Sequence, residues 1–431
     1  MKTAGAWQLA RRDLLAMSGS RQQRAHLKRP IWIIFFVSLV ILFLIGAYVV
    51  FPSRSFAACY FFSSKDCTML NLPVSPPARE LTDHENIAWV VINELLRKPP
   101  VQSKNPKIAF LFLTPGTLPF EKLWEKFFQI GCEWKCEVSL NIKWLMLKIF
   151  YHQNFTLWSW EMGHEDRFSV YVHASSQKPV HVSHYFVGRD IHSEKVAWGK
   201  ISMLDAEKRL LAHALLDADN QQFVLLSDSC VPLHNFDYVY NYLMYTNVSY
   251  IDCFEDPGPH GSGRYSEHML PELEKKDFRK GAQWFSMKRQ HAIVIMADNL
   301  FYRKFKFYCK VSNPPPNMDG RNCYADEHYL PTLFHMIDPS GISNWSVTHV
   351  DWSEGKWHPK AYRAQDVTFE LLKSIASIDE TVHVTSTGKK KKTVQPCLWN
   401  GMKRPCYLFA RKFYPETLDR LLFLFSNYTT V

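Results

Sequence analysis

The chain has 431 residues, of which 47% are hydrophobic and 15% aromatic, so it can build one large domain or two ordinary ones, and an intrinsically disordered protein is excluded. The net charge of +10 lies partly in the amino-terminal tail and partly in four lysines at 389–392, which suits an anionic membrane surface or an anionic small molecule. No zinc-finger spacing or other known nucleic-acid module is present, so we expect no nucleic-acid partner.

Residues 31–51 form an uncharged segment of mainly Ile, Leu, Val and Phe. As a helix rising about 1.5 Å per residue it would be roughly 31 Å long, which matches the apolar core of a bilayer. Basic residues in the tail, residues 1–30, predict that this side stays in the cytosol. Because the segment is longer than the apolar core of a cleaved signal peptide, we expect an uncleaved anchor with the rest of the chain in the lumen, a type II arrangement.

The sequence after the anchor fits a lumenal compartment. All ten cysteines follow the anchor, where disulfides can form. The plausible pairs, close together in sequence, are Cys59 with Cys67, Cys309 with Cys323, and Cys397 with Cys406. Sequence does not fix this connectivity, and free buried thiols remain the alternative. Sequons for N-glycosylation begin at Asn154, Asn247, Asn344 and Asn427.

A proline-punctuated stem is predicted over residues 52–106, with one helix over 83–97, and a globular domain over residues 107–431. Buried strands are predicted in this domain over residues 107–113, 168–173, 223–227 and 248–253. Helices are predicted over residues 119–128, 203–216, 234–243 and 289–301.

Alternation of strands and helices predicts an α/β fold with a largely parallel sheet. Ligands of such sheets bind beyond the carboxyl ends of the strands. The residues that follow the predicted strands are Thr114, His173, Ser175, Asp228 and Ser229, and we expect them near the mouth of a site.

The stretch from Asn322 to Pro331 carries two adjacent carboxylates, Asp326 and Glu327, at the start of a predicted short helix that Pro331 ends or kinks. Adjacent side chains on a helix point about 100° apart, so the two groups cannot do the same work. One can cap the helix, and the other can project into a cleft as a base. Two ordinary acidic residues in a first turn are the alternative.

Nine motifs occur in an order that resembles one family. They are KIAFLFLTPG, FSVYVHAS, KVAWGKISMLDAEKRLLAHAL, FVLLSDSCVPLHNF, FEDPGPHGSGRY, RKGAQWFSMKRQHA, CYADEHYLPTL, VDWSEGKWHP and RPCYLFARKF. This part of the chain, from about residue 107 to the end, resembles the plant branch of the core-2/I-branching β-1,6-N-acetylglucosaminyltransferases, the brittle-culm-type glycosyltransferases. The resemblance implies a Rossmann-like glycosyltransferase A fold in the Golgi lumen, nucleotide-sugar binding, transfer with inversion and no bound metal.

The donor side is expected around the ends of the first strands. Metal-using enzymes of this fold carry Asp-x-Asp after the central strand, whereas this chain has the single carboxylate of Asp228 there, a poor Mg²⁺ or Mn²⁺ site. Asp228 is therefore a candidate for contacts with sugar or nucleotide hydroxyls, with capping of the next turn as the alternative. The resemblance places His173 and Ser175 where the family holds the nucleoside, although a strand-end histidine satisfied within the fold is equally compatible.

Without a metal, cationic side chains must stabilise the departing diphosphate. The resemblance assigns this role to Lys412, with Arg411 beside it, and to an upstream arginine for which Arg363 is the candidate. Lys360 or Arg404 could replace Arg363. The alternative for each cation is an ordinary solvated charge.

On the acceptor side, the resemblance makes Glu327 the base that accepts the proton of the acceptor hydroxyl. Asp326 is then the helix-start partner, with the capping role. Trp284 is a candidate platform for a sugar ring, with core packing as the alternative. Glu255 and Asp256 are further acceptor-side candidates, and they precede a Gly-rich stretch, residues 257–263, predicted to be a mobile binding loop.

Residues 130–162 depart from the family, which runs on directly between the flanking motifs. A translated unspliced intron is the favoured explanation, and an unusual lumenal loop is the other. Peptide mass spectrometry of the native protein would detect these residues if they are genuine.

The sequence as a whole predicts a type II Golgi glycosyltransferase that moves a sugar, N-acetylglucosamine-like or other, from a nucleotide sugar to a glycan acceptor. We expect a UDP-sugar as the donor and no metal cofactor. Two other classes stay open. One is a catalytically inactive lectin-like or scaffold protein of the membrane. The other is a glycan-processing hydrolase, which needs two carboxyl groups roughly 5–9 Å apart.

Overall fold

The computed structural model describes residues 39, 87, 103–129, 164, 166–310, 322–356 and 358–429. The chain divides into two compact units, Met1–Glu80 and Leu81–Val431, and the helices and strands given below belong to the second. The predicted anchor 31–51, the stem helix 83–97 and the insertion 130–162 lie outside the described residues, apart from Leu39 and Ile87. Within the described ranges, no helix is long and apolar enough to cross a membrane.

A six-stranded sheet forms the centre of the second unit, with the strand order β2-β1-β3-β6-β5-β7. These strands are β1 Lys107–Thr114, β2 Phe168–Ala174, β3 Asn220–Ser227, β5 Ser249–Asp252, β6 Ser286–Lys288 and β7 Ile342–Asn344. β1 runs parallel to both β2 and β3, and β5 runs parallel to β7, whereas β6 is antiparallel to its two neighbours. The prediction of a mixed α/β fold with a mostly parallel sheet is therefore confirmed.

Both faces of the sheet are buried, which explains the uninterrupted apolar strands. Because side chains alternate along a strand, Phe110 and Phe112 of β1 enter one hydrophobic cluster and Ala109 and Leu111 enter the other. Helices α5 Glu121–Phe128, α8 Phe236–Met244, α12 Phe369–Ala376 and α13 Leu418–Thr429 contribute to the first cluster. Helices α7 Ile201–Leu215, α9 Arg289–Ala297, α10 Leu300–Tyr308 and α11 Ala325–Ile337 contribute to the second.

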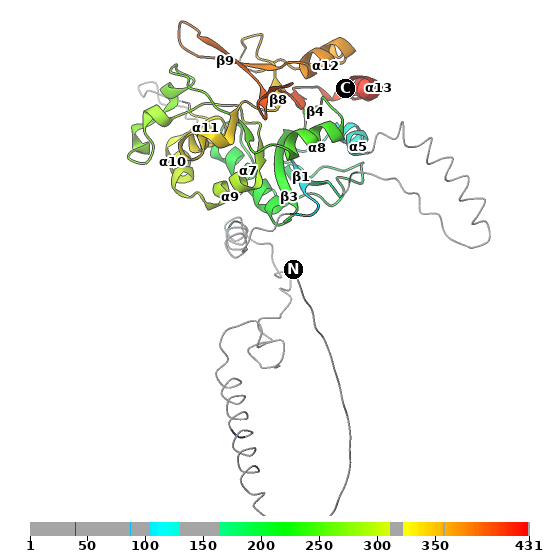
Figure 1. The fold of residues 1–431 in the computed structure, drawn as a ribbon, viewed down its shortest axis with the longest axis horizontal. Coiled ribbons are helices and arrows are strands. Elements are labelled where there is room, and N and C mark those ends of the chain that lie inside the picture. Colours follow the sequence, from blue (N-terminus) through cyan, green and yellow to red (C-terminus); the bar gives the residue numbers. More distant parts are fainter. Residues whose placement is uncertain are drawn as a thin grey trace, which may run out of the picture. The chain divides into compact units, whose positions relative to one another are not determined.

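Short strands from the carboxyl-terminal part of the chain form smaller sheets. β4 Val231–Pro232, β13 Phe409–Arg411 and β8 Thr348–Val350 form a three-stranded sheet, and β9 Glu380–Val384 pairs with β10 Lys392–Pro396 as a hairpin. β11 Leu398–Trp399 and β12 Met402–Lys403 form a further pair. Figure 1 shows β4, β8, β9, α12 and α13 gathered along one side of the domain, away from α7 and α9. β13 is the middle strand of the three-stranded sheet, parallel to β8 and antiparallel to β4.

Two helix predictions need correction. The single helix predicted over residues 289–301 is two helices, because the Asp298 carboxylate accepts the backbone N–H groups of Phe301 and Tyr302 at 3.0 and 2.8 Å and starts α10. Of the two outcomes predicted at Pro331, an end or a kink of the helix, the end is wrong, since α11 continues to Ile337.

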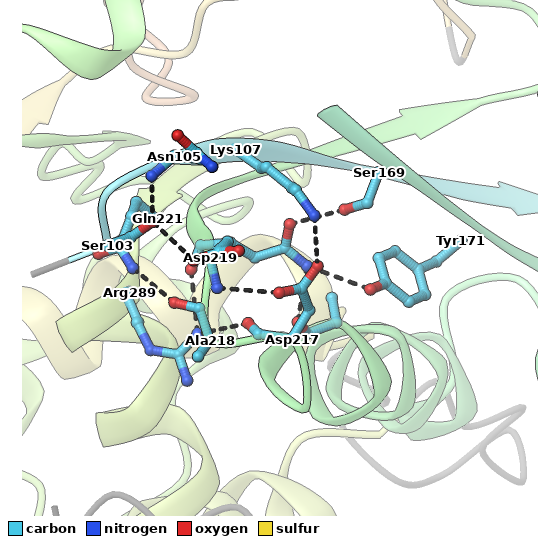
Figure 2. A network of polar contacts seen from close by, with 12 residues as sticks. Ser103, Asn105, Lys107, Ser169, Tyr171, Asp217, Ala218, Asp219, Gln221 and Arg289 are labelled. Carbon is cyan, nitrogen blue, oxygen red and sulfur yellow. Dashed lines mark hydrogen bonds and ion pairs between the residues drawn. The ribbon is translucent and has the colours of Figure 1, made fainter. Parts of the chain in front are cut away.

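A polar network, drawn in Figure 2, holds the start of β1 against the loop between α7 and β3. Lys107 Nζ lies 3.2 Å from Asp217 Oδ2, and Ser103 Oγ donates to Asp219 Oδ1 at 2.7 Å. The Arg289 guanidinium donates to the carbonyl oxygens of Leu215, Asp217 and Asn220 at 2.9 to 3.0 Å. The bond to Leu215 satisfies a carbonyl that the end of α7 leaves without a helical donor, and the other two hold the turn that leads into β3.

Two of the three predicted disulfides are confirmed. Cys309 joins Cys323 between α10 and α11, and Cys397 joins Cys406 beside the β11–β12 pair. The third predicted pair, Cys59 with Cys67, lies outside the described residues. Cys230 and Cys253 are free and buried.

Candidate active site

A pocket of about 460 Å³ opens where segments distant in sequence converge. It is lined by Asp252 at the end of β5, the loop 280–284, the first turn of α11, the loop after β8, β9 of the hairpin, and Arg411 and Lys412 at the end of β13. Glu327, Trp284, Arg411 and Lys412, predicted separately from the sequence, therefore line one cavity.

Glu327 lies in the first turn of α11 and has an ion-pair partner that the sequence analysis did not identify. Its Oε2 accepts from Arg264 Nη1 at 2.7 Å. The guanidinium of Arg264 also lies 4.5 Å from the ring centre of Tyr324, the residue that precedes α11. The Glu327 side chain keeps 31% of its surface exposed, whereas Arg264 keeps 10%, so the carboxylate stays open to the pocket while its partner is largely enclosed.

His328 contacts the same guanidinium nitrogen of Arg264 as Glu327 does. Its Nε2 lies 3.3 Å from Arg264 Nη1, and its Nδ1 lies 2.7 Å from the carbonyl oxygen of Arg279. Burial lowers the pKa of His328 to about 3, and the charge of Arg264 adds to the decrease. The ring is therefore neutral, so it can accept from Arg264 while its Nδ1–H donates to the backbone.

Asp326 does not cap α11, contrary to the sequence prediction. The N-cap residue is Tyr324, with no side-chain capping bond, and Asp326 lies inside the first turn. Its side chain is buried, lines the pocket, and leaves Oδ1 without a hydrogen-bond partner among the described residues. Burial raises the pKa of Asp326 to about 7, and the adjacent charge of Glu327 contributes.

A second buried carboxyl group, Glu207 of α7, lies close enough to Asp326 to interact with its charge. Burial raises the pKa of Glu207 well above its usual range, and Asp326 contributes to the increase. Gln283 Nε2 donates to Glu207 Oε1 at 2.9 Å. Close to the half-buried Glu327 there is thus a buried acidic layer, Asp326 and Glu207, in which both carboxyl groups have raised pKa values.

Arg411 and Lys412 form a cationic corner beside Asp228, which follows β3. Burial lowers the pKa of Lys412, and the charge of Arg411 lowers it further. Burial raises the pKa of Asp228, while Arg411 and Lys412 oppose the increase. Arg411 Cζ lies 4.1 Å from the ring centre of Trp284, and its buried Nε has no hydrogen-bond partner in the described part of the chain. Two cations facing one carboxylate leave an excess of positive charge for an anionic ligand.

Trp284 is buried, with 5% of its surface exposed, although it lines the pocket. Ser346 Oγ donates to its carbonyl oxygen at 2.7 Å. One ring face is occupied by Arg411, so the side chain combines core packing with support of a pocket cation.

More exposed aromatic rings stand elsewhere along the pocket. Trp198 and Trp352 keep 58% and 55% of their surface exposed. The ring of Trp198 lies 5.2 Å from that of Tyr324 and 6.1 Å from that of His358. These rings offer apolar faces on which a sugar can stack.

Three predicted nucleoside-side residues lie at the carboxyl ends of β1 and β2, outside the pocket lining. Thr114 Oγ1 donates to the carbonyl oxygen of Thr117 at 2.9 Å. His173 Nε2 lies 2.9 Å from Arg209 Nη1, and the Ser175 N–H donates to the carbonyl oxygen of Thr114 at 2.8 Å. Their contact with a nucleotide stays a prediction.

The remaining predicted residues do not line the pocket. The Asp256 carboxylate accepts from Ser386 N, Ser386 Oγ and Gly258 N at 2.7 to 2.9 Å, which ties the Gly-rich loop to the hairpin. Burial opposes but does not outweigh these bonds, and the pKa of Asp256 is lowered. Glu255 is exposed. Arg363 is also exposed, 3.4 Å from Glu416, and does not line the pocket.

The two alternatives to Arg363 do not line the pocket either. Lys360 Nζ lies 5.3 Å from the ring centre of Tyr362, and Arg404 Cζ lies 4.1 Å from that of Trp399. The pocket contains other cations, Lys280, Lys356 and Arg264. All three belong to the motifs that carry the family resemblance. Nothing in those motifs alone distinguishes a cationic side chain that lines the pocket from one on the surface.

The predicted glycosylation sites differ in accessibility. Asn247 and Asn427 are exposed and Asn344 is half-buried, whereas Asn154 lies outside the described residues.

Comparison with known proteins shows which family the chain belongs to. The sequence model of the Core-2/I-Branching enzyme family matches residues 143–376. A rice protein (Oryza sativa subsp. japonica), Glycosyltransferase BC10, is 33% identical over 346 residues, which cover 74% of this chain and 76% of that protein. The chain therefore belongs to the plant branch of the Core-2/I-branching enzyme family and is a glycosyltransferase.

Proposed function

We propose that the chain transfers a sugar, N-acetylglucosamine-like or other, from a UDP-sugar to a hydroxyl of a glycan acceptor, with inversion and without a metal ion. The observation that carries the proposal is that one pocket combines a half-buried carboxylate, Glu327, with two cations, the half-buried Arg411 and the exposed Lys412. Inverting transfer needs a base on the acceptor side and positive charge on the leaving-group side.

In the proposed reaction, the acceptor hydroxyl attacks the anomeric carbon while Glu327 accepts its proton. The bond between that carbon and the diphosphate oxygen breaks, and the diphosphate leaves with the electron pair. Lys412 and Arg411 stabilise the negative charge that develops on the leaving group. Attack and departure on opposite faces invert the anomeric centre. Arg264 holds one oxygen of Glu327 at 2.7 Å and so fixes the direction of the other.

The charges around Asp228 support the metal-free proposal. A divalent cation needs several oxygen ligands, and among the described residues Asp228 belongs to no group of three or more side chains that could hold one. The charges of Arg411 and Lys412 act on the same carboxylate. The two cations repel a metal ion and supply the positive charge that it would otherwise bring.

A direct test screens the purified full-length protein in detergent against nucleotide sugars and glycan acceptors, with and without EDTA. Glu327→Gln should abolish turnover and retain nucleotide binding, whereas Glu267→Gln, a matched change at an exposed residue, should alter neither. A scaffold protein would be indifferent to Glu327→Gln, and a hydrolase would release free sugar without an acceptor. A strict requirement for Mn²⁺ would refute the metal-free reaction.

We also propose that residues 31–51 anchor the enzyme in the Golgi membrane with its active site in the lumen. The uncharged segment and the basic tail before it support this orientation. Protease treatment of sealed vesicles tests it: a tag at the amino terminus should be digested, and a tag at the carboxyl terminus should be protected. The opposite pattern would overturn the proposed orientation.

A further inference from the structure

Pro331 stands inside α11, the helix that carries Glu327 in its first turn. In an uninterrupted helix the N–H of residue 331 would donate to the carbonyl oxygen of residue 327. Proline has no N–H, and its ring crowds the carbonyl four residues earlier. The main-chain oxygen of Glu327 is thus left without its helical donor.

A donor from outside the helix takes this position. The backbone N–H of Gly281 donates to the Glu327 carbonyl oxygen at 2.9 Å. A Cβ atom at residue 281 would lie 1.9 Å from the carbonyl oxygen of Asp252, so the close approach requires glycine. The contact between loop 280–284 and the first turn of α11 is therefore made here by backbone atoms alone.

The same loop is also held by Asp252. Its Oδ2 accepts from the backbone N–H of Ala282 at 2.8 Å, and its Oδ1 lies 2.7 Å from Nε2 of His383 in the hairpin. Lys280 exchanges two backbone hydrogen bonds with Phe254, at 2.8 and 3.0 Å. The loop thus has fixed contacts at consecutive residues, and one of them ends on the residue proposed as the base.

We propose that Pro331 is a positioning residue that leaves the Glu327 carbonyl free to bind loop 280–284, and so fixes the base relative to the pocket wall. The loop carries Trp284, on which Arg411 stacks, so the contact links the base to the cationic corner. The catalytic part of this inference rests on the proposed function, whereas the backbone contact itself does not.

The test is Pro331→Ala in the full-length protein, with Ile337→Ala as a control at an exposed position of the same helix. Alanine restores an N–H that competes with Gly281 for the Glu327 carbonyl, so amide hydrogen exchange in residues 280–284 should accelerate. A carbonyl can accept two bonds, so we expect kcat to fall by about 5- to 10-fold rather than to vanish. The KM for the nucleotide sugar should change less than about twofold, because the substitution does not alter binding that is equally strong in the ground state and the transition state.

The melting temperature separates positioning from stability. Alanine is a better helix residue than proline, so Pro331→Ala should melt at the same temperature as the parent protein or higher while turning over more slowly. Gly281→Ala, which displaces the loop instead of competing with it, should reproduce the lower kcat and the faster exchange.

Unchanged exchange in residues 280–284 together with an unchanged kcat in Pro331→Ala would overturn the inference. If Pro331→Ala does not fold, Pro331→Ser supplies the same N–H and is read in the same way. If neither the parent protein nor Pro331→Ala shows transferase activity, but exchange in residues 280–284 is faster in the variant, the proposed function is refuted and the backbone contact is established.

Discussion

Replacement of Asp326 by asparagine should stabilise the protein in neutral and alkaline solution and have much less effect in acid. The pKa of Asp326 is raised to about 7 from an ordinary value of 3.8. The folded state therefore holds this proton more tightly than the unfolded state does. The stabilisation that results is fully present below the ordinary pKa and is lost as pH rises through the raised one.

The size of the effect follows from the same two values. A pKa raised from 3.8 to about 7 corresponds to about 4 kcal/mol of stability lost between acid and alkaline solution, as an upper bound. Asparagine has nearly the same shape and never ionises, so it removes this loss. The gain of Asp326→Asn should therefore be roughly 2–4 kcal/mol larger at pH 8.5 than at pH 4.

Urea unfolding of the full-length parent and of Asp326→Asn at these two pH values measures the difference. Asp277→Asn is a suitable control, because Asp277 lies on a surface turn rather than in the buried layer. Equal gains at both pH values would mean that the Asp326 carboxylate is stabilised as well in the folded protein as in water, and would refute the reasoning from its burial.

Three further changes have defined outcomes. Lys412→Met should lower kcat about 10²- to 10³-fold in steady-state kinetics, because the positive charge at the leaving group is lost. Lys390→Met is the control and should leave kcat unchanged. Equal kcat values for the two variants would contradict the role assigned to Lys412. Trp198→Ala should raise the acceptor KM about 5-fold or more with kcat nearly constant, and an unchanged KM would exclude stacking at this ring. Arg289→Met should lower the free energy of unfolding by about 2–4 kcal/mol in urea titrations, because three carbonyl oxygens lose their donor. A loss under about 0.5 kcal/mol would mean that water replaces the guanidinium as the donor.

The central strands and most helices could be predicted because their signals are local. The run from Lys107 forms β1 as predicted, since a strand buried on both faces is apolar at every position. The break between α9 and α10 was also encoded locally, by Asp298 and Asn299, two residue types that favour helix starts. The periodic pattern across residues 289–301 hid this signal.

The candidate site was predictable only in outline. The pairing of Arg264 with Glu327 joins a loop to a helix far along the chain, and no local pattern encodes which of many arginines makes it. The burial of Asp326 depends on how α7 packs against α11, so its helix-start chemistry gave the wrong role. The same limit applies to Arg363, whose sequence context does not show that it pairs with Glu416 at the surface.

The disulfide between Cys309 and Cys323 has a consequence for how such an enzyme can evolve. It fixes the two chain positions with their Cα atoms 4.8 Å apart, at the end of α10 and just before α11. The segment between the two cysteines can therefore gain or lose residues without moving the helix that carries Glu327. Once the ends of this loop are joined, each added residue costs little conformational entropy. The length of this segment can therefore vary between related chains while the position of Glu327 is kept.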